Sequence, residues 1–205
     1  MTCPDDRRRA LLARAAACAA SIALVGCATL PPPAAPDRVH AGRFSVVVAL
    51  DGQRDSASGR FTLSISGARA VLDLATPLGS TLARIERGPE GVLLRINGAS
   101  GPEERRGTDG AALTEALLGW PLPVDGMADW VTGRPAPGST AQTDGLDPPR
   151  AFTQNGWRIE IGDRFASGQP RQLTFTRPAQ PARDFAAAAP AITLRLLIDD
   201  PSAGS

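Results

Sequence analysis

The stretch Arg43-Phe44-Ser45-Val46-Val47-Val48-Ala49-Leu50 decides the fold class of this chain. The large apolar residues Phe44, Val46, Val48 and Leu50 recur in it at every second position. Successive side chains of a β-strand point to opposite faces, so a period of two predicts a strand with one apolar face. Such strands are typical of antiparallel sheets that pack on one side and meet water on the other.

The same alternation returns along most of the chain. It recurs in residues 60–66, 72–74, 92–96, 157–161, 172–176 and 192–198. Turn-forming residues such as Asp51-Gly52, Ser66-Gly67 and Gly88-Pro89-Glu90-Gly91 separate these runs. Short strands at this spacing predict a sandwich or barrel rather than βαβ units.

The middle of the chain changes to helical spacing. Thr108-Asp109 offers an N-cap, Leu113, Leu117 and Leu118 follow at helical intervals, and Gly119 is a stop signal. A second short helix is predicted over residues 124–131, after the stiff turn Gly119-Trp120-Pro121-Leu122-Pro123. We therefore predict a mainly β chain in which two short helices cover one open end of a curved antiparallel sheet.

The N-terminus has the features of a secretory signal. Four arginines and a short apolar run, residues 15–25, precede Leu24-Val25-Gly26-Cys27, which resembles a bacterial lipobox. The resemblance implies cleavage after Gly26 and lipid on Cys27, although a chance match in an alanine-rich leader is the alternative. The apolar run is shorter than the ~20 residues that a spanning helix needs.

Cleavage would leave a nearly neutral chain with Cys27 as its one cysteine. It would carry 18 basic and 19 acidic side chains, too balanced for a nucleic-acid surface, and it could form no internal disulfide. We expect a signal peptide over 1–26, a lipidated, proline-rich tether over 27–38, one folded domain over 39–200 and a tail over 201–205. By resemblance to other lipoproteins, Ala28 in place of aspartate favours the outer membrane.

Several motifs in order resemble the LolB family of outer-membrane lipoprotein receptors. They are Gly42-Arg43-Phe44, Thr76-Pro77-Leu78-Gly79-Ser80-Thr81, Leu122-Pro123, Asp129-Trp130-Val131-Thr132-Gly133-Arg134-Pro135, Gln154-Asn155-Gly156-Trp157-Arg158-Ile159 and Leu194-Arg195-Leu196-Leu197-Ile198-Asp199. The chain departs from the family pattern at both ends. It lacks the usual helical stretch before the first strand and the aromatic ending after the last one.

The resemblance implies an unclosed β-barrel with a helical lid over an apolar cavity. It implies a monomer that accepts lipoproteins from the periplasmic carrier LolA, holds their acyl chains and inserts them into the outer membrane, to which its own lipid anchors it. No cofactor and no nucleotide is expected, because the chain has no Walker-type glycine loop.

Inward-facing apolar residues are the candidates for the cavity lining. They are Phe44, Val46, Val48, Phe61, Leu63, Leu72, Leu74, Leu94, Ile96, Trp130, Trp157, Phe175, Leu194 and Leu196. The alternative is that they fill a solid core, since packed barrels show the same alternation and large aromatics are usually core residues.

The turn Pro77-Leu78-Gly79 matches the family's membrane-insertion loop. Between proline and glycine, the Leu78 side chain is expected to protrude, and by the match it dips toward the membrane. The alternative is a turn leucine folded back onto the core.

No catalytic or metal site is predicted. His40 is the one histidine of the chain and has no partners for a triad or a metal site. Glu103-Glu104-Arg105-Arg106 indicates a solvated hairpin rim, and Asp199-Asp200 lacks calcium-loop spacing. Two other functions stay open, a structural or assembly lipoprotein of the envelope and an envelope hydrolase.

Overall fold

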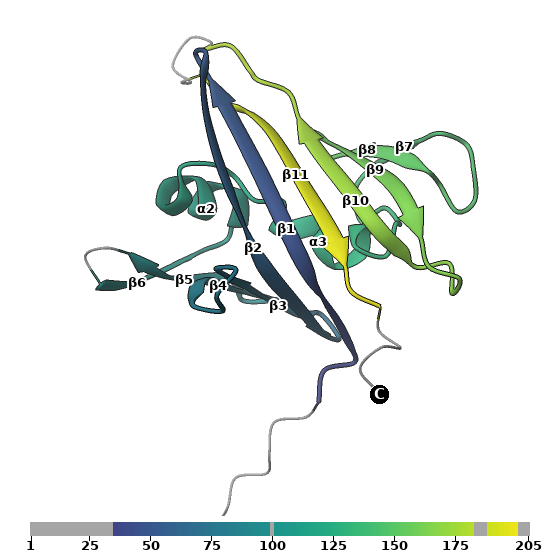
Figure 1. Cartoon of the computed structure of the whole chain (residues 1–205), viewed down its shortest axis with the longest axis horizontal. Helices are drawn as coiled ribbons and strands as arrows, with labels where there is room; N and C mark the ends of the chain where they lie inside the picture. The colour runs from purple at the N-terminus through teal and green to yellow at the C-terminus, as the bar shows by residue number, and fades with distance from the viewer. Residues whose placement is uncertain (1–34, 99–100, 183–187, 201–205) are drawn as a thin grey trace, which may run out of the picture. The chain divides into compact units, whose positions relative to one another are not determined.

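The computed structural model describes residues 35–98, 101–182 and 188–200. These residues form one antiparallel sheet in the order β6-β5-β4-β3-β2-β1-β11-β10-β9-β8-β7, which leaves β6 and β7 as unjoined edges (Figure 1). The strands are β1 (Arg38–Leu50), β2 (Gln53–Ser66), β3 (Arg69–Ala75), β4 (Thr81–Gly88), β5 (Gly91–Gly98), β6 (Gly101–Gly107), β7 (Gln142–Thr143), β8 (Ala151–Gln154), β9 (Trp157–Arg164), β10 (Pro170–Arg177) and β11 (Ala191–Ile198). The predicted open, barrel-like β fold is confirmed.

The long hairpin β1–β2 forms the middle of the sheet, and β11 pairs with the other edge of β1. Its turn has positive φ at both Asp51 (50°) and Gly52 (81°), as a two-residue type I′ turn requires. Phe44 lies opposite Gly59 within this hairpin, and it lies opposite Leu196 of β11 on the other side of β1. The apolar positions of neighbouring strands therefore line up on one face.

That face carries the core. Phe44 and Val46 of β1 are buried, as are Phe61, Leu63 and Ile65 of β2. The intervening positions Arg43, Ser45 and Val47 are exposed. The period of two thus separates a packed inner face from a wet outer face, as the sequence predicts.

Charged side chains form a ladder across the outer face of β3–β6. Arg84 on β4 donates to both carboxylate oxygens of Asp73 on β3, at 2.9 and 3.0 Å. Arg95 on β5 bridges Glu86 and Glu104. The sequence indicated a solvated hairpin rim at 103–106, and the structure places these residues in β6 at the sheet edge, where charges discourage pairing with other chains.

Two helices cover the inner face of the sheet (Figure 1). Helix α2 (Gly110–Leu118) begins where Asp109 Oδ1 accepts from the Ala112 amide at 3.0 Å, and it ends at Gly119 with φ 80°. Helix α3 (Val124–Trp130) follows after the turn. Both helices span residues close to those that the sequence predicts. None of the described helices is long and apolar enough to cross a bilayer.

A buried side-chain amide fixes the end of α3. Gln154 of β8 is 1% exposed; its Oε1 accepts from Trp130 Nε1 at 2.6 Å and from the Ala136 amide at 2.8 Å. Its Nε2 donates to the carbonyl oxygens of Ala136 and Ser139. This amide holds the indole of α3 and the loop after it against β8.

Replacing Gly59 with alanine is expected to destabilise the sheet by about 1–3 kcal/mol, the usual range for overpacking. The added Cβ would overlap the Ala75 carbonyl oxygen of β3 and lie 2.9 Å from Phe44 Cε1. Urea unfolding measures the effect. Gly162→Ala is the matched control, because its Cβ would meet Gln172 side-chain atoms at an ordinary 3.4 Å. Equal stability of the two variants would contradict this packing.

Gln154→Ala is expected to lower the free energy of unfolding by about 2 kcal/mol or more, since it leaves buried donors such as the Trp130 indole without their acceptor. Gln142→Ala is the control, because Gln142 lies exposed on β7. Thermal unfolding of both variants measures the difference. A Gln154 variant as stable as the Gln142 variant would show that the amide does not hold α3.

Candidate functional site

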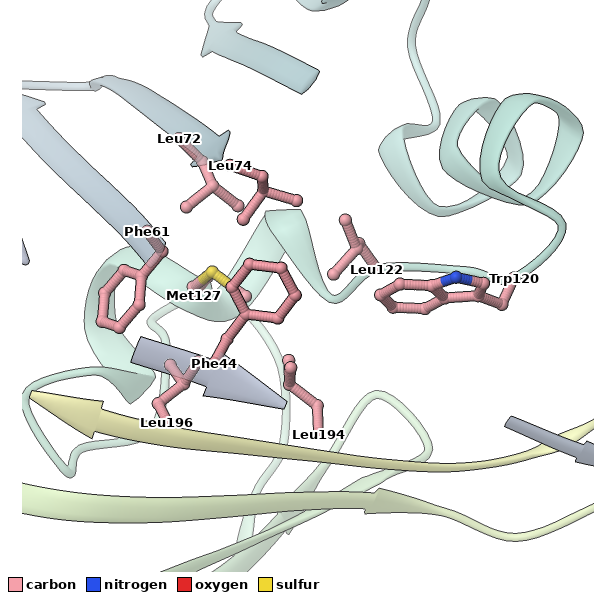
Figure 2. A pocket seen from close by; sticks show the side chains of 9 residues that line it. All are labelled: Phe44, Phe61, Leu72, Leu74, Trp120, Leu122, Met127, Leu194 and Leu196. Atoms are coloured by element: carbon pink, nitrogen blue, oxygen red, sulfur yellow. The ribbon is translucent and has the colours of Figure 1, made fainter. Parts of the chain in front are cut away.

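Helices α2 and α3, with the turn 119–123 between them, form a helical layer over the sheet. A small apolar cavity lies between the inner face of the sheet and this helical layer (Figure 2). The sheet contributes six side chains to its lining and the helical layer contributes three. They are Phe44, Phe61, Leu72, Leu74, Leu194 and Leu196 from the sheet, and Trp120, Leu122 and Met127 from the helical layer. Among its lining side chains the Trp120 indole N–H is the one hydrogen-bonding group of conventional strength.

Strand register brings the sheet's share of this lining together. Phe44 lies opposite Leu196, and Phe61 lies opposite Leu74. Cross-strand pairs on one face are within van der Waals reach of each other, so they form a continuous apolar floor. The six residues that the sheet contributes are all among the candidates chosen from the sequence.

The free volume of the cavity is about 10 Å³. That is room for roughly one water-sized sphere, and an apolar cavity of this kind stays dry. An acyl chain of about a dozen methylenes, each close to the size of a water molecule, does not fit into it. The predicted apolar cavity is present, but it is closed, so an acyl chain could enter only if side chains or backbone of the helical layer move away from the sheet.

The other lining candidates lie deeper in the same core or at its margin. Val46, Leu63, Leu94, Trp130, Trp157 and Phe175 are buried, and Val48 and Ile96 are partly buried against the core. Leu63 borders a second small apolar space, next to Leu72 and Met127. Trp130 packs on Phe152 and Phe175, with ring centroids 6.5 and 6.2 Å apart. None of these eight residues lines the cavity itself.

Sequence reasoning missed the three residues of the helical layer. Trp120, Leu122 and Met127 do not belong to a strand, so the period of two gives no sign of them. The signal that could have found them is the apolar stretch at residues 120–127 in a segment expected to cover the sheet.

The helical layer is held differently at its two ends. At the Trp130 end the attachment is the buried Gln154 amide, while at the start of α3 Arg87 Nε donates to Asp125 Oδ1 at 2.8 Å, in an exposed ion pair. Thr114 Oγ1 accepts from the Leu122 amide at 2.8 Å and ties the turn to α2. Exposed pairs contribute about 0–1 kcal/mol, so the polar attachment at the start of α3 is the weaker of the two.

Leu78 projects into solvent from the turn between β3 and β4, with 96% of its surface exposed. The Thr76 amide donates to the Ser80 carbonyl at 2.8 Å, and the Gly79 amide donates to the Thr76 carbonyl at 2.9 Å. Gly79 has φ 93°, a conformation that glycine adopts without strain. The turn is thus ordered by its own hydrogen bonds while its leucine packs on nothing.

His40 is the one buried titratable side chain in the part of the chain that the structure describes. Burial, with a smaller contribution from Arg38, lowers the pKa of His40, and its Nε2 has no hydrogen-bond partner among the described residues. Within the same residues no three His, Cys, Asp or Glu side chains are grouped so that they could hold a metal ion. The predicted lipid site at Cys27, the signal peptide and most of the tether lie outside the described residues.

Comparison with known proteins gives a consistent result. The family model described as outer membrane lipoprotein LolB matches residues 40–200. A protein named outer-membrane lipoprotein LolB from Thiobacillus denitrificans is 38% identical over 162 residues, 76% of this chain and 85% of that protein. One of the same name from Bordetella pertussis is 37% identical over 189 residues, 87% of each chain. Another, from Cupriavidus necator, is 32% identical over 189 residues, 88% of this chain and 91% of that one. The chain therefore belongs to the LolB family of outer-membrane lipoproteins.

Proposed function

We propose that this protein is a lipid-anchored receptor on the periplasmic face of the outer membrane, which accepts lipoproteins from a periplasmic carrier of the LolA kind and inserts them into that membrane. Membership of the LolB family indicates an outer-membrane lipoprotein that is involved in the localisation of lipoproteins. The observation that supports the finer proposal is the apolar cavity between the sheet and the helical layer.

Acyl chains need such a cavity because water opposes their transfer. Burying an acyl chain is worth about 0.8 kcal/mol per methylene, or roughly 10 kcal/mol for a dozen. Passage from the apolar site of a carrier to another apolar site leaves this term nearly unchanged. The transfer then needs no nucleotide and no catalytic group, and an affinity difference of about 1.4 kcal/mol favours one direction tenfold.

Loading requires that an acyl chain replace contacts that the helical layer now makes. Leu122 and Met127 are 2% and 3% exposed in the closed structure. Lifting them without a ligand would expose apolar area at a cost of about 25 cal/mol per Å². An entering chain covers the same surfaces, so much of this cost is offset in the loaded state.

Release into the bilayer is assigned to the Leu78 turn. A single exposed leucine on a rigid turn can enter the acyl region of a membrane and disturb lipid packing next to the receptor. The fully solvated position of Leu78 supports this role, because a side chain with no partner in the protein is free to contact another phase.

The direct test of the proposal is native mass spectrometry of the mature chain carrying Cys27→Ser, purified without detergent and mixed with a lysophospholipid below its micelle-forming concentration. We expect a complex with a single acyl chain. A protein that stays ligand-free but retains a protein partner from the envelope would contradict the receptor and favour the assembly lipoprotein, for which the filled interior of the closed state would be sufficient.

Leu78→Glu is expected to accept lipoprotein from the carrier at the normal level but to insert it into liposomes at least severalfold more slowly, because a carboxylate is costly in the acyl region. Leu146→Glu is the matched control, since Leu146 is also exposed (52%) but lies in the loop before β8. Liposome flotation of labelled lipoprotein measures insertion. Equal insertion by both variants would remove the role assigned to Leu78.

A further inference from the structure

The geometry points to Trp120 as the residue that controls entry to the cavity: we propose that an acyl chain passes between the Trp120 indole and the sheet, and that the ring must swing aside to admit it. This inference rests on the proposed function and adds the entry route and its controlling residue.

Exposure distinguishes Trp120 from the rest of the lining. The other eight lining residues are buried, with 2–8% of their surface exposed, whereas Trp120 is partly exposed. Figure 2 shows Trp120 at one end of the group of side chains and Phe61 at the other. Among the residues that line the cavity, Trp120 is therefore the one that borders both the cavity and the solvent.

The backbone on both sides of Trp120 is fixed by hydrogen bonds and burial, while its side chain is only partly buried and makes no hydrogen bond among the described residues. The next residues, Pro121, Leu122 and Pro123, are buried, and the Leu122 amide is bound by Thr114 Oγ1. Gly119 before it is the C-cap of α2. Rotation of one side chain is thus the smallest movement that opens this end of the cavity.

The two tryptophans of the helical layer differ in how the ring is held. Trp130 Nε1 donates to the buried Gln154 amide, and this indole is 1% exposed. Among the described residues no protein group accepts a hydrogen bond from the Trp120 indole nitrogen. An indole with an apolar body and a polar edge suits a boundary between a cavity and water.

A route through the second small apolar space is less suitable for an acyl chain. This space shares Leu72 and Met127 with the cavity and is also lined by the Arg87 side chain. The guanidinium of Arg87 is paired with Asp125 at the start of α3. A chain entering there would have to pass a charged pair, whereas at Trp120 it meets an aromatic ring.

Stopped-flow fluorescence of the mature chain carrying Cys27→Ser tests this route. The probe is a lysophospholipid with a brominated acyl chain, which quenches nearby tryptophans. Trp120→Ala is expected to take up the probe about tenfold faster, equivalent to about 1.4 kcal/mol of barrier, with the rate at which the buried tryptophans Trp130 and Trp157 are quenched as the readout. The uptake rate of Trp120→Phe should fall between the rates of Trp120→Ala and the parent chain, because a phenyl ring is smaller than an indole.

Leu146→Ala serves as the control for a lost apolar surface residue and should keep the parent rate. If Trp120→Ala does not fold, the rates of Trp120→Phe and Trp120→Leu carry the same test. If all Trp120 variants take up the probe at the rate of the parent chain, the entry route is overturned. The proposed receptor function would not be affected by that result. Absence of uptake by the parent chain as well would overturn both the route and the proposed function.

Discussion

The contact between the apolar face of the sheet and the underside of the helical layer is the interaction on which the rest of the structure depends. Leu122 and Met127 close over Phe44, Phe61 and their neighbours and leave a space of about 10 Å³. This contact buries the core of the only sheet in the described residues. It also closes the surface that an acyl chain would need, so stability and proposed function use the same side chains.

In the proposed function the helical layer leaves the sheet reversibly. A difference between the polar attachments at its two ends would suit such a movement. The buried amide of Gln154 holds the Trp130 end, and an exposed pair of Arg87 with Asp125 holds the other. The sheet has two open edges, with no closing strand pair among the described residues, so the proposed movement would not have to break a closed barrel.

Much of the fold could be predicted from the sequence because its signals are local. The period of two marks the strands of the sheet's inner face, and Asp109 and Gly119 mark the ends of α2. Strands β4, β6, β7 and β8 escaped prediction for physical reasons. Strands β7 and β8 have two and four residues, too few for an alternation to stand out. Leu82 breaks the alternation of β4 on its exposed face, and the 103–106 part of β6 consists of charged residues that are strand because they pair with β5.

The site was only partly predictable. Alternation identifies which residues face inward, and it supplied all six that the sheet contributes to the cavity. It cannot tell a hollow interior from a filled one, because the free volume depends on how closely the helical layer approaches. Leu122 and Met127 belong to that layer, and their place over Phe44 arises from tertiary packing rather than from spacing in the chain.

The most direct measurement is an NMR experiment with a ¹³C-labelled lysophospholipid bound to the mature chain carrying Cys27→Ser. Nuclear Overhauser contacts between the acyl chain and protein methyl groups report where the chain lies. An acyl chain under the lifted helical layer predicts contacts with Leu72, Leu194 and Met127. Contacts confined to surface leucines such as Leu78 and Leu146, with the inner methyl groups undisturbed, would contradict a cavity that opens to hold lipid.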